Sequence, residues 1–333
     1  MPDPKPAAGA AGAEPRRRRY ARAPAPLTGI SPVKMQLLRY LAECRFLALP
    51  QLARLARLEG EMDMASVKSA RRHLRALFDA GLVEVFPVSR LALATPDAAN
   101  DATLLYGSAP NIYAPSARGL DALVRAGLIE PDWAKRPFPT YGPKNTLFLA
   151  HELLVRDVRV WLERCAAGAP QDVRRWEDGA EAAIDLGRPV APFQARPDAW
   201  FVYCLSQADD GRETVLVGLV EVDRGTERGK TRWAEKLAAY GALFSGDGLR
   251  LATGYRNARV LVLAPSAARR DTLARLIAGV IGTAGLAERF WLAETATLNA
   301  ATLSAPVWRR IGGTALAPLI SPDASRSEPV GGG

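Results

Sequence analysis

Two carboxylates, Glu221 and Asp223, end the apolar stretch VLVGLVEVD, and the basic segment RGTERGKTRWAEKLAAY follows at once. Residues two apart on a strand project from the same face, and like charges a few ångströms apart repel each other. A third carboxylate, Asp198, follows Pro197 at the start of the preceding apolar stretch, at a separation that suits a hairpin return. The pattern therefore raises two interpretations: a metal site that cleaves a phosphodiester, or a strand that simply runs out into water.

The composition narrows the class of partner. The chain has 333 residues, a hydrophobic content of 48% and a formal net charge of +9 with a pI of about 9.7. That length allows two ordinary domains, and the charge favours a polyanion such as double-stranded DNA. No apolar run reaches the roughly 20 residues that a transmembrane helix needs, and no signal peptide is recognisable at the N-terminus. We expect a cytoplasmic protein that does not bind a membrane.

Cysteine and histidine chemistry is not expected. Cys44, Cys165 and Cys204 lie far apart in apolar surroundings and lack metal-ligand spacing. They are predicted to be reduced, buried thiols. His73 and His151 are the two histidines, too few for a histidine-based metal site or a catalytic triad.

A first folded unit is expected over residues 28–131. Before it, residues 1–27 form a low-complexity tail around EPRRRRYAR that cannot bury enough apolar area to order itself. The pattern predicts three helices, at residues 31–46, 49–60 and 63–79, followed by a strand at 82–88. After a polar span at 89–108, residues 110–127 are predicted to form a second strand and a fourth helix. Ser31 is expected to cap the first helix before Pro32, and Ser116 the fourth. The first helix is expected to turn inward the apolar residues Val33, Leu37, Leu38 and Leu41.

This unit resembles winged helix-turn-helix DNA-binding domains. The third helix runs directly into GLVEV, and the second strand ends in YAPSARG, which fits the pattern Y-x-P-S-x-x-G. The outward face of the third helix carries four cations, Lys68, Arg71, Arg72 and Arg75. Because an α-helix fits the major groove, these side chains are candidates for contacts with phosphates and base edges. The alternative is an ordinary soluble helix with surface arginines.

A second unit is expected over residues 144–319, after a proline-dense linker at 132–143 and before a flexible tail at 320–333. The predicted elements are a helix at 145–166, strands at 173–177, 196–205 and 213–225, a helix at 229–244, a strand at 258–266, a helix at 267–281 and a strand at 289–294. The order α-β-β-β-α-β resembles the restriction-endonuclease-like PD-(D/E)XK fold. The fold class is thus α/β (α+β), a winged helix followed by a mixed-sheet, nuclease-like domain.

That resemblance implies a set of site residues. Carboxylates at adjacent strand ends of this fold hold Mg²⁺, for which Mn²⁺ can substitute; here they are Asp198, Glu221 and Asp223. Glu152 matches the acid that many members carry in the leading helix. The motif expects lysine where this chain has Asp223, and some members take the lysine from the following helix instead. Lys230 and Lys236 are then the candidates, and Lys236 is preferred because it lies one turn from both Trp233 and Tyr240.

The substitution at Asp223 leaves a second interpretation open. The added acid either strengthens metal binding or forms a salt-bridge cluster with nearby cations, namely Arg224, Arg228 and Lys230. Near the C-terminus, Trp308, Arg309 and Arg310 similarly fit either a docked tail or a phosphate contact.

Over residues 30–312 the chain resembles the replication-relaxation family of plasmids and other mobile elements. The matching stretches are LPQLARL, GLVEV, AHELLVRDV, RPDAW, VEVDRGTE, EKLAAY, VLVLAPS and APVWRR. The resemblance implies DNA binding linked to plasmid replication or relaxation, with replication or relaxase proteins as further partners. Two hypotheses follow: a metal-dependent DNA endonuclease or nickase, or a non-catalytic regulator whose second domain binds DNA or a partner protein.

Overall fold

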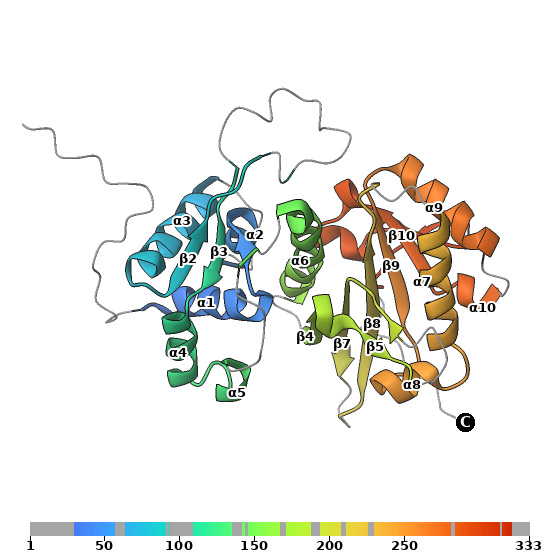
Figure 1. The fold of residues 1–333 in the computed structure, drawn as a ribbon, viewed down its shortest axis with the longest axis horizontal. Coiled ribbons are helices and arrows are strands. Elements are labelled where there is room, and N and C mark those ends of the chain that lie inside the picture. Colours follow the sequence, from blue (N-terminus) through green and yellow to red (C-terminus); the bar gives the residue numbers. More distant parts are fainter. Residues whose placement is uncertain are drawn as a thin grey trace, which may run out of the picture.

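The computed structural model describes residues 30–56, 64–90, 93, 109–134, 142–143, 146–166, 171–187, 194–207, 211–225, 230–280, 284–313 and 315–321. It is a mixed α/β structure with a three-stranded and a seven-stranded sheet (Figure 1). The N-terminal tail at 1–27 and most of the polar span, the linker and the C-terminal tail lie outside the described residues.

The N-terminal part consists of helices packed against the three-stranded sheet. Its elements are α1 (Pro32–Cys44), β1 (Leu47–Ala48), α2 (Leu49–Ala56), α3 (Met64–Asp79), β2 (Val83–Phe86), β3 (Ile112–Pro115), α4 (Ala117–Arg125) and the short α5 (Pro131–Ala134). The four predicted helices and two predicted strands are confirmed. β1 was not predicted; it pairs with β3, so the antiparallel sheet has the order β1-β3-β2.

Two local predictions for α1 need correction. Ser31 stands at the N-cap, but its side chain makes no capping hydrogen bond; instead its carbonyl oxygen accepts from the Met35 N–H at 3.1 Å. Val33 is 41% exposed, because the buried face of α1 begins one turn later with Leu37 and Leu38. By contrast, Ser116 caps α4 as predicted, its hydroxyl accepting from the Gly119 N–H at 3.0 Å.

Gly119 explains the glycine of the YAPSARG motif. A Cβ built there would lie 2.1 Å from the Leu82 carbonyl oxygen, so α4 approaches the start of β2 closely enough to require glycine. We expect Gly119→Ala to destabilise the protein by about 1–3 kcal/mol through overpacking. Gly279→Ala, where a Cβ meets nothing within 4 Å, is the control and is expected to be neutral or slightly stabilising. Chemical denaturation measures both, and equal stabilities would contradict the explanation.

The C-terminal part is built on the seven-stranded sheet, in the order β12-β11-β10-β9-β8-β7-β4. The strands are β4 (Asp172–Asp178), β7 (Ala199–Gln207), β8 (Glu213–Val222), β9 (Arg259–Ala264), β10 (Phe290–Glu294), β11 (Trp308–Arg310) and β12 (Leu316–Ala317). β8, β9 and β10 run parallel, and the other neighbouring pairs are antiparallel. The strands predicted from sequence are all present. The structure also contains elements that the sequence does not predict: β11, β12, the short pair β5 (Ile184–Asp185) and β6 (Gln194–Ala195), and the helices α8 (Gly248–Thr253) and α10 (Ala284–Ala287).

Helices cover both faces of this sheet. α6 (Thr146–Ala166) packs on one face, where Val158, Trp161 and Leu162 meet alternate residues of β7, β8 and β9. α7 (Lys230–Leu243), α8 and α9 (Ala267–Val280) cover the other face through a second apolar cluster. Trp308, on β11, is buried in the α6-side cluster, which agrees with a docked position for this side chain. The phosphate contact considered for Arg309 and Arg310 stays a prediction.

α6 also joins the two parts (Figure 1). Its residues Leu149 and Leu153 pack with Phe46, Ala48 and Ile112 of the N-terminal part. Gln51 of α2 donates a hydrogen bond to the Leu153 carbonyl at 2.8 Å, and Arg159 of α6 pairs with Glu43 of α1. A single helix therefore belongs to the cores of both parts and couples them.

Cys44 and Cys204 are buried and Cys165 is partly buried, and all three are free thiols as predicted. Among the described residues, no helix combines the length and the apolar character that a membrane crossing requires.

Candidate functional site

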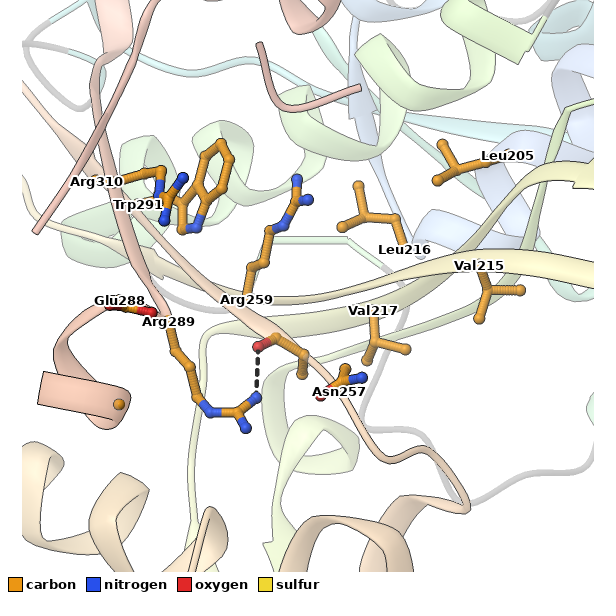
Figure 2. A pocket seen from close by; sticks show the side chains of 12 residues that line it. Leu205, Val215, Leu216, Val217, Asn257, Arg259, Glu288, Arg289, Trp291 and Arg310 are labelled. Atoms are coloured by element: carbon orange, nitrogen blue, oxygen red, sulfur yellow. Dashed lines mark hydrogen bonds between the residues drawn. The ribbon is translucent and has the colours of Figure 1, made fainter. Parts of the chain in front are cut away.

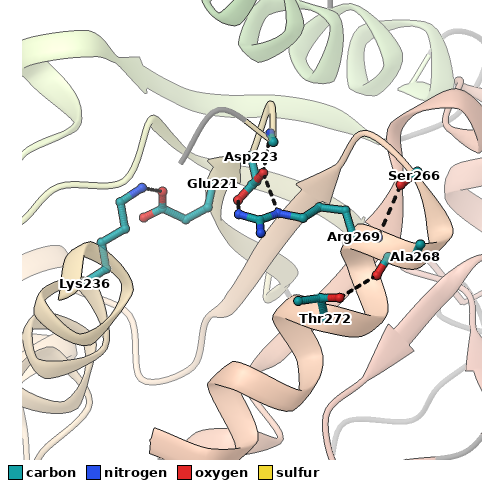
Figure 3. A network of polar contacts seen from close by, with 8 residues as sticks. Glu221, Asp223, Lys236, Ser266, Ala268, Arg269 and Thr272 are labelled. Atoms are coloured by element: carbon teal, nitrogen blue, oxygen red, sulfur yellow. Dashed lines mark hydrogen bonds and ion pairs between the residues drawn. The ribbon is translucent and has the colours of Figure 1, made fainter. Parts of the chain in front are cut away.

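The two candidate acids Glu221 and Asp223 lie at the end of β8. Glu221 is the penultimate residue of β8 and its side chain is 1% exposed, and Asp223 follows the strand. Both point to the face covered by α7 and α9, but in different directions: Glu221 meets α7 and Asp223 meets α9 (Figure 3). The same-face prediction therefore agrees with the structure, while the two carboxylates have separate partners.

Glu221 is held by two side chains of α7. Lys236 Nζ donates to Glu221 Oε2 at 2.5 Å, and the Tyr240 hydroxyl donates to Oε1 at 2.6 Å. Burial raises the pKa of Glu221 to about 7, although the charge of Lys236 opposes that rise. A buried carboxylate with this pKa can change its protonation state near neutral pH.

Asp198 lies beside the same cluster. One of its oxygens accepts from the Val222 backbone N–H at 2.7 Å and lies 3.1 Å from His151 Nε2. Burial alone would raise the pKa of Asp198, but its hydrogen bond with His151 and the charges of His151 and Lys236 outweigh that and lower it. Burial lowers the pKa of His151, but the hydrogen bond to Asp198 and the charge of Asp198 outweigh burial, so the pKa of His151 is raised. Asp198 therefore favours its ionised form, whereas burial makes the neighbouring Glu221 favour its neutral form.

Asp223 is engaged elsewhere. Arg269 of α9 donates to its two carboxylate oxygens at 3.1 and 2.7 Å, and the Gly225 N–H donates to Oδ1 at 2.6 Å (Figure 3). Arg269, an arginine further along the chain, is therefore an ion-pair partner of Asp223. Arg228 and the side chain of Lys230 lie outside the described residues, so the cluster considered from sequence stays a prediction. A planar guanidinium that grips a carboxylate with two hydrogen bonds is a strong pair. Within the described ranges, no three His, Cys, Asp or Glu side chains form a group able to hold a metal ion.

Two further predicted site residues are Glu152 and Lys230. Glu152 lies on α6 next to His151, and it is His151 that contacts Asp198. The backbone carbonyl of Glu152 accepts a hydrogen bond from Arg156. Lys230 begins α7, and its side chain lies outside the described part of the chain. The structure thus brings together Asp198, Glu221 and Lys236, and adds His151 and Tyr240.

His151 and Arg269 were missed by sequence reasoning. Because two histidines are too few for a histidine-based metal site or triad, the sequence gives His151 no role. The sequence contains one signal for it: in AHELLVRDV, His151 stands one residue before the candidate acid Glu152. The sequence around Arg269 contains no signal for this role. Arg269 is far from Asp223 in the sequence, and the two residues come together because β8 and β9 are neighbouring parallel strands.

The second candidate surface is the outer face of α3. Lys68, Arg71 and Arg72 are exposed, while Ala70, Leu74 and Leu77 on the opposite side are buried. Arg75 is only partly exposed and pairs with Asp79 at 2.9 Å, so the predicted four-cation face has three exposed members. A cavity of about 210 Å³ lies beside this face, between α3 and the sheet, and is lined by Arg71, Arg75, Asn111 and Tyr113 among others.

Comparison with known proteins identifies the family of this chain. The family model described as replication-relaxation matches residues 38–256, more than half of the sequence. The chain belongs to the replication-relaxation family. The matched region runs from α1 to just before β9 and includes α3, Asp198, Glu221 and Lys236. No curated protein and no solved structure matched the chain. The membership suggests a role in replication or mobilisation, and it leaves the chemistry to be argued from the residues.

Proposed function

We propose that this replication-relaxation protein binds double-stranded DNA through the exposed face of α3, in the manner of a winged helix-turn-helix. The observation that carries the proposal is the α3 surface: three exposed cations on a helix whose other side is fixed in the core. An α-helix fits the major groove, and phosphate contacts from such cations position a protein on duplex DNA. In this proposal residues 28–131 form the DNA-binding domain and residues 144–319 a nuclease-like domain, joined by a linker at 132–143.

The test is the affinity for duplex DNA, measured by fluorescence anisotropy at fixed salt. We expect the triple variant Lys68→Ala/Arg71→Ala/Arg72→Ala to bind at least tenfold more weakly, on the order expected for three lost phosphate contacts. The control triple is Arg232→Ala/Arg250→Ala/Arg275→Ala on α7, α8 and α9, at the other end of the molecule from α3 (Figure 1). It removes the same charge and is expected to bind nearly as tightly as wild type.

A second candidate function is metal-dependent cleavage of the bound DNA, favoured by the contact between Lys236 and Glu221 beside Asp198. Asp198 and Glu221 fit a hard cation such as Mg²⁺, because they supply carboxylate oxygens with unused lone pairs. Asp223 has no role in this proposal, because its ion pair with Arg269 directs it toward α9 and away from Lys236 on α7 (Figure 3). When bound, Mg²⁺ polarises a phosphate and lowers the pKa of water.

The residues of the chain have definable roles in this second proposal. Lys236 places a positive charge where a phosphate bound beside Glu221 develops negative charge. Tyr240 fixes the orientation of Glu221 through its hydroxyl, and His151 does the same for Asp198. Because the pKa of Glu221 is about 7, its carboxylate can accept a proton near neutral pH.

Supercoiled plasmid incubated with the protein and Mg²⁺ or Mn²⁺ tests the cleavage proposal. We expect nicking that is lost in Asp198→Asn, Glu221→Gln and Lys236→Met, whereas Asp223→Asn retains it. Loss of nicking in Asp223→Asn as well would contradict the division of roles drawn above. Intact plasmid together with a salt-sensitive gel shift would reject cleavage and favour a non-catalytic regulator that binds DNA with a replication or relaxase partner.

A further inference from the structure

One aromatic side chain at the start of α6 is exposed to solvent. Phe148 is 62% exposed, whereas the other aromatic side chains in the described part of the chain are buried or half-buried. It lies in the first turn of α6, the helix between the part that carries α3 and the part that carries the acidic cluster of Asp198 and Glu221 (Figure 1). The ring is therefore available to a partner at the boundary between the two parts.

Arginine side chains lie against many of the other aromatic rings of this protein. The guanidinium carbon lies between 3.8 and 6.0 Å from the ring centre in the pairs Arg75–Phe78, Arg156–Phe46, Arg159–Trp176, Arg175–Trp200, Arg259–Trp291, Arg289–Phe244 and Arg310–Trp291. Trp291, with Arg259 and Arg310 beside it, is only 7% exposed (Figure 2). Within the described residues, no arginine or lysine lies against Phe148 in this way. Phe148 thus departs from the pattern that the rest of the molecule follows.

The exposed ring lies near the acidic cluster. Phe148 precedes His151 and Glu152 by one helical turn, and side chains three or four residues apart lie on the same side of a helix. His151 Nε2 lies 3.1 Å from the Asp198 carboxylate, which accepts a hydrogen bond from the backbone N–H that follows Glu221. The start of α6 is therefore held against the same edge of the sheet as the two acids.

The surroundings of Phe148 favour a nucleic-acid base over a protein as its partner. Its neighbours one turn along α6, His151 and Glu152, are polar, and the apolar Leu149 and Leu153 are turned into the core. The other large apolar side chains that are exposed lie elsewhere on the chain, namely Val33, Leu128, Leu251, Val280 and Leu316. A protein partner covers a contiguous apolar patch, whereas a base needs only the face of one ring.

We propose that Phe148 stacks on an unpaired base of a DNA strand that passes the acidic cluster. The bases of a duplex are stacked on one another, so the ring reaches the face of a base only where the strand is unpaired. The substrate is then a junction at which the duplex held by α3 continues into a single strand. This inference rests on the proposed DNA binding and adds the class of substrate, whether or not the strand is cleaved.

Fluorescence anisotropy of the full-length protein with three DNA probes tests the proposal: a blunt duplex, the same duplex with a single-stranded extension, and the extension alone. Wild type is expected to bind the extended duplex more tightly than the blunt one. Phe148→Ala is expected to bind the extended duplex and the single strand about tenfold more weakly, the loss expected for one stacked base, and to bind the blunt duplex like wild type. Phe148→Trp keeps a ring that can stack, so it is expected to retain the affinity.

Leu251→Ala is the matched control, because it removes an apolar side chain of α8 that is 77% exposed, and it is expected to bind all three probes like wild type. Circular dichroism establishes that the variants fold. In the background of the α3 triple variant, the effect of Phe148→Ala on the single strand should persist, so a failure of duplex binding by α3 is distinguishable from a failure of stacking. Equal affinities of wild type and Phe148→Ala for the extended duplex, or an equal loss on the blunt duplex, would overturn the proposal.

Discussion

Arg156→Ala is expected to lower the free energy of unfolding by about 3 kcal/mol or more, among the largest single-residue effects in this protein. Arg156 is 2% exposed and lies on α6, between the two parts of the chain. Its Nε donates to the Cys44 carbonyl at 2.8 Å, its Nη1 donates to the Glu152 carbonyl at 2.7 Å, and its guanidinium lies 3.8 Å from the centre of the Phe46 ring. Alanine would leave buried carbonyls without a donor and a cavity against Phe46.

Chemical denaturation followed by both circular dichroism and tryptophan fluorescence measures this effect. Arg156→Lys keeps the charge but not the forked donors, so we expect an intermediate loss. Arg174→Ala, which removes an exposed arginine of β4, is expected to leave stability unchanged within error. If α6 couples the two parts, the two probes should report one transition in wild type and separate transitions in Arg156→Ala. A variant as stable as wild type would show that this contact does not couple them.

Glu221→Gln is expected to change the pH dependence of stability. Burial raises the pKa of Glu221 from 4.5 to about 7, so the native state holds this proton more tightly than the unfolded chain does. Its contribution to stability is therefore fully present below about pH 4.5 and is lost as the pH rises through about 7. The shift corresponds to roughly 3 kcal/mol. Glutamine resembles the neutral acid and does not titrate.

The measurement is the free energy of unfolding of wild type and Glu221→Gln between pH 4 and pH 8.5. The stability of the variant relative to wild type should increase by roughly 3 kcal/mol across this range. Glu235→Gln, at an exposed position of α7, changes the charge equally and should follow the wild-type profile. Parallel profiles for wild type and Glu221→Gln would mean that Lys236 and Tyr240 keep Glu221 ionised throughout.

The sequence predicted the principal helices and strands because their hydrophobic periods are strong. VLVGLVEV reads as a buried strand, and the alternation of cations with Leu74 and Leu77 reads as an exposed helix with one core face. The two-residue strand β1 was missed because so short a segment has no period, and it forms only by pairing with β3. β11 and β12 likewise depend on the edge of a sheet that is already formed.

For the acidic cluster, the sequence indicated residues but not their pairing. Helical spacing favours Lys236 over Lys230, since one turn separates Lys236 from Trp233 and Tyr240 and so places it near the sheet. Its contact with Glu221 is known only from the structure. The pairs of Asp223 with Arg269 and of Asp198 with His151 join separate elements across the sheet. Such contacts depend on strand order and helix placement, which local patterns do not encode.

The salt dependence of duplex binding is the most direct test of the central claim, that α3 contacts the DNA phosphates. Each phosphate contact contributes about one unit to the slope of log affinity against log salt concentration. The account predicts a slope shallower by about three for Lys68→Ala/Arg71→Ala/Arg72→Ala than for wild type. Identical slopes and affinities for the two proteins would contradict it and assign DNA binding, if any, to another surface.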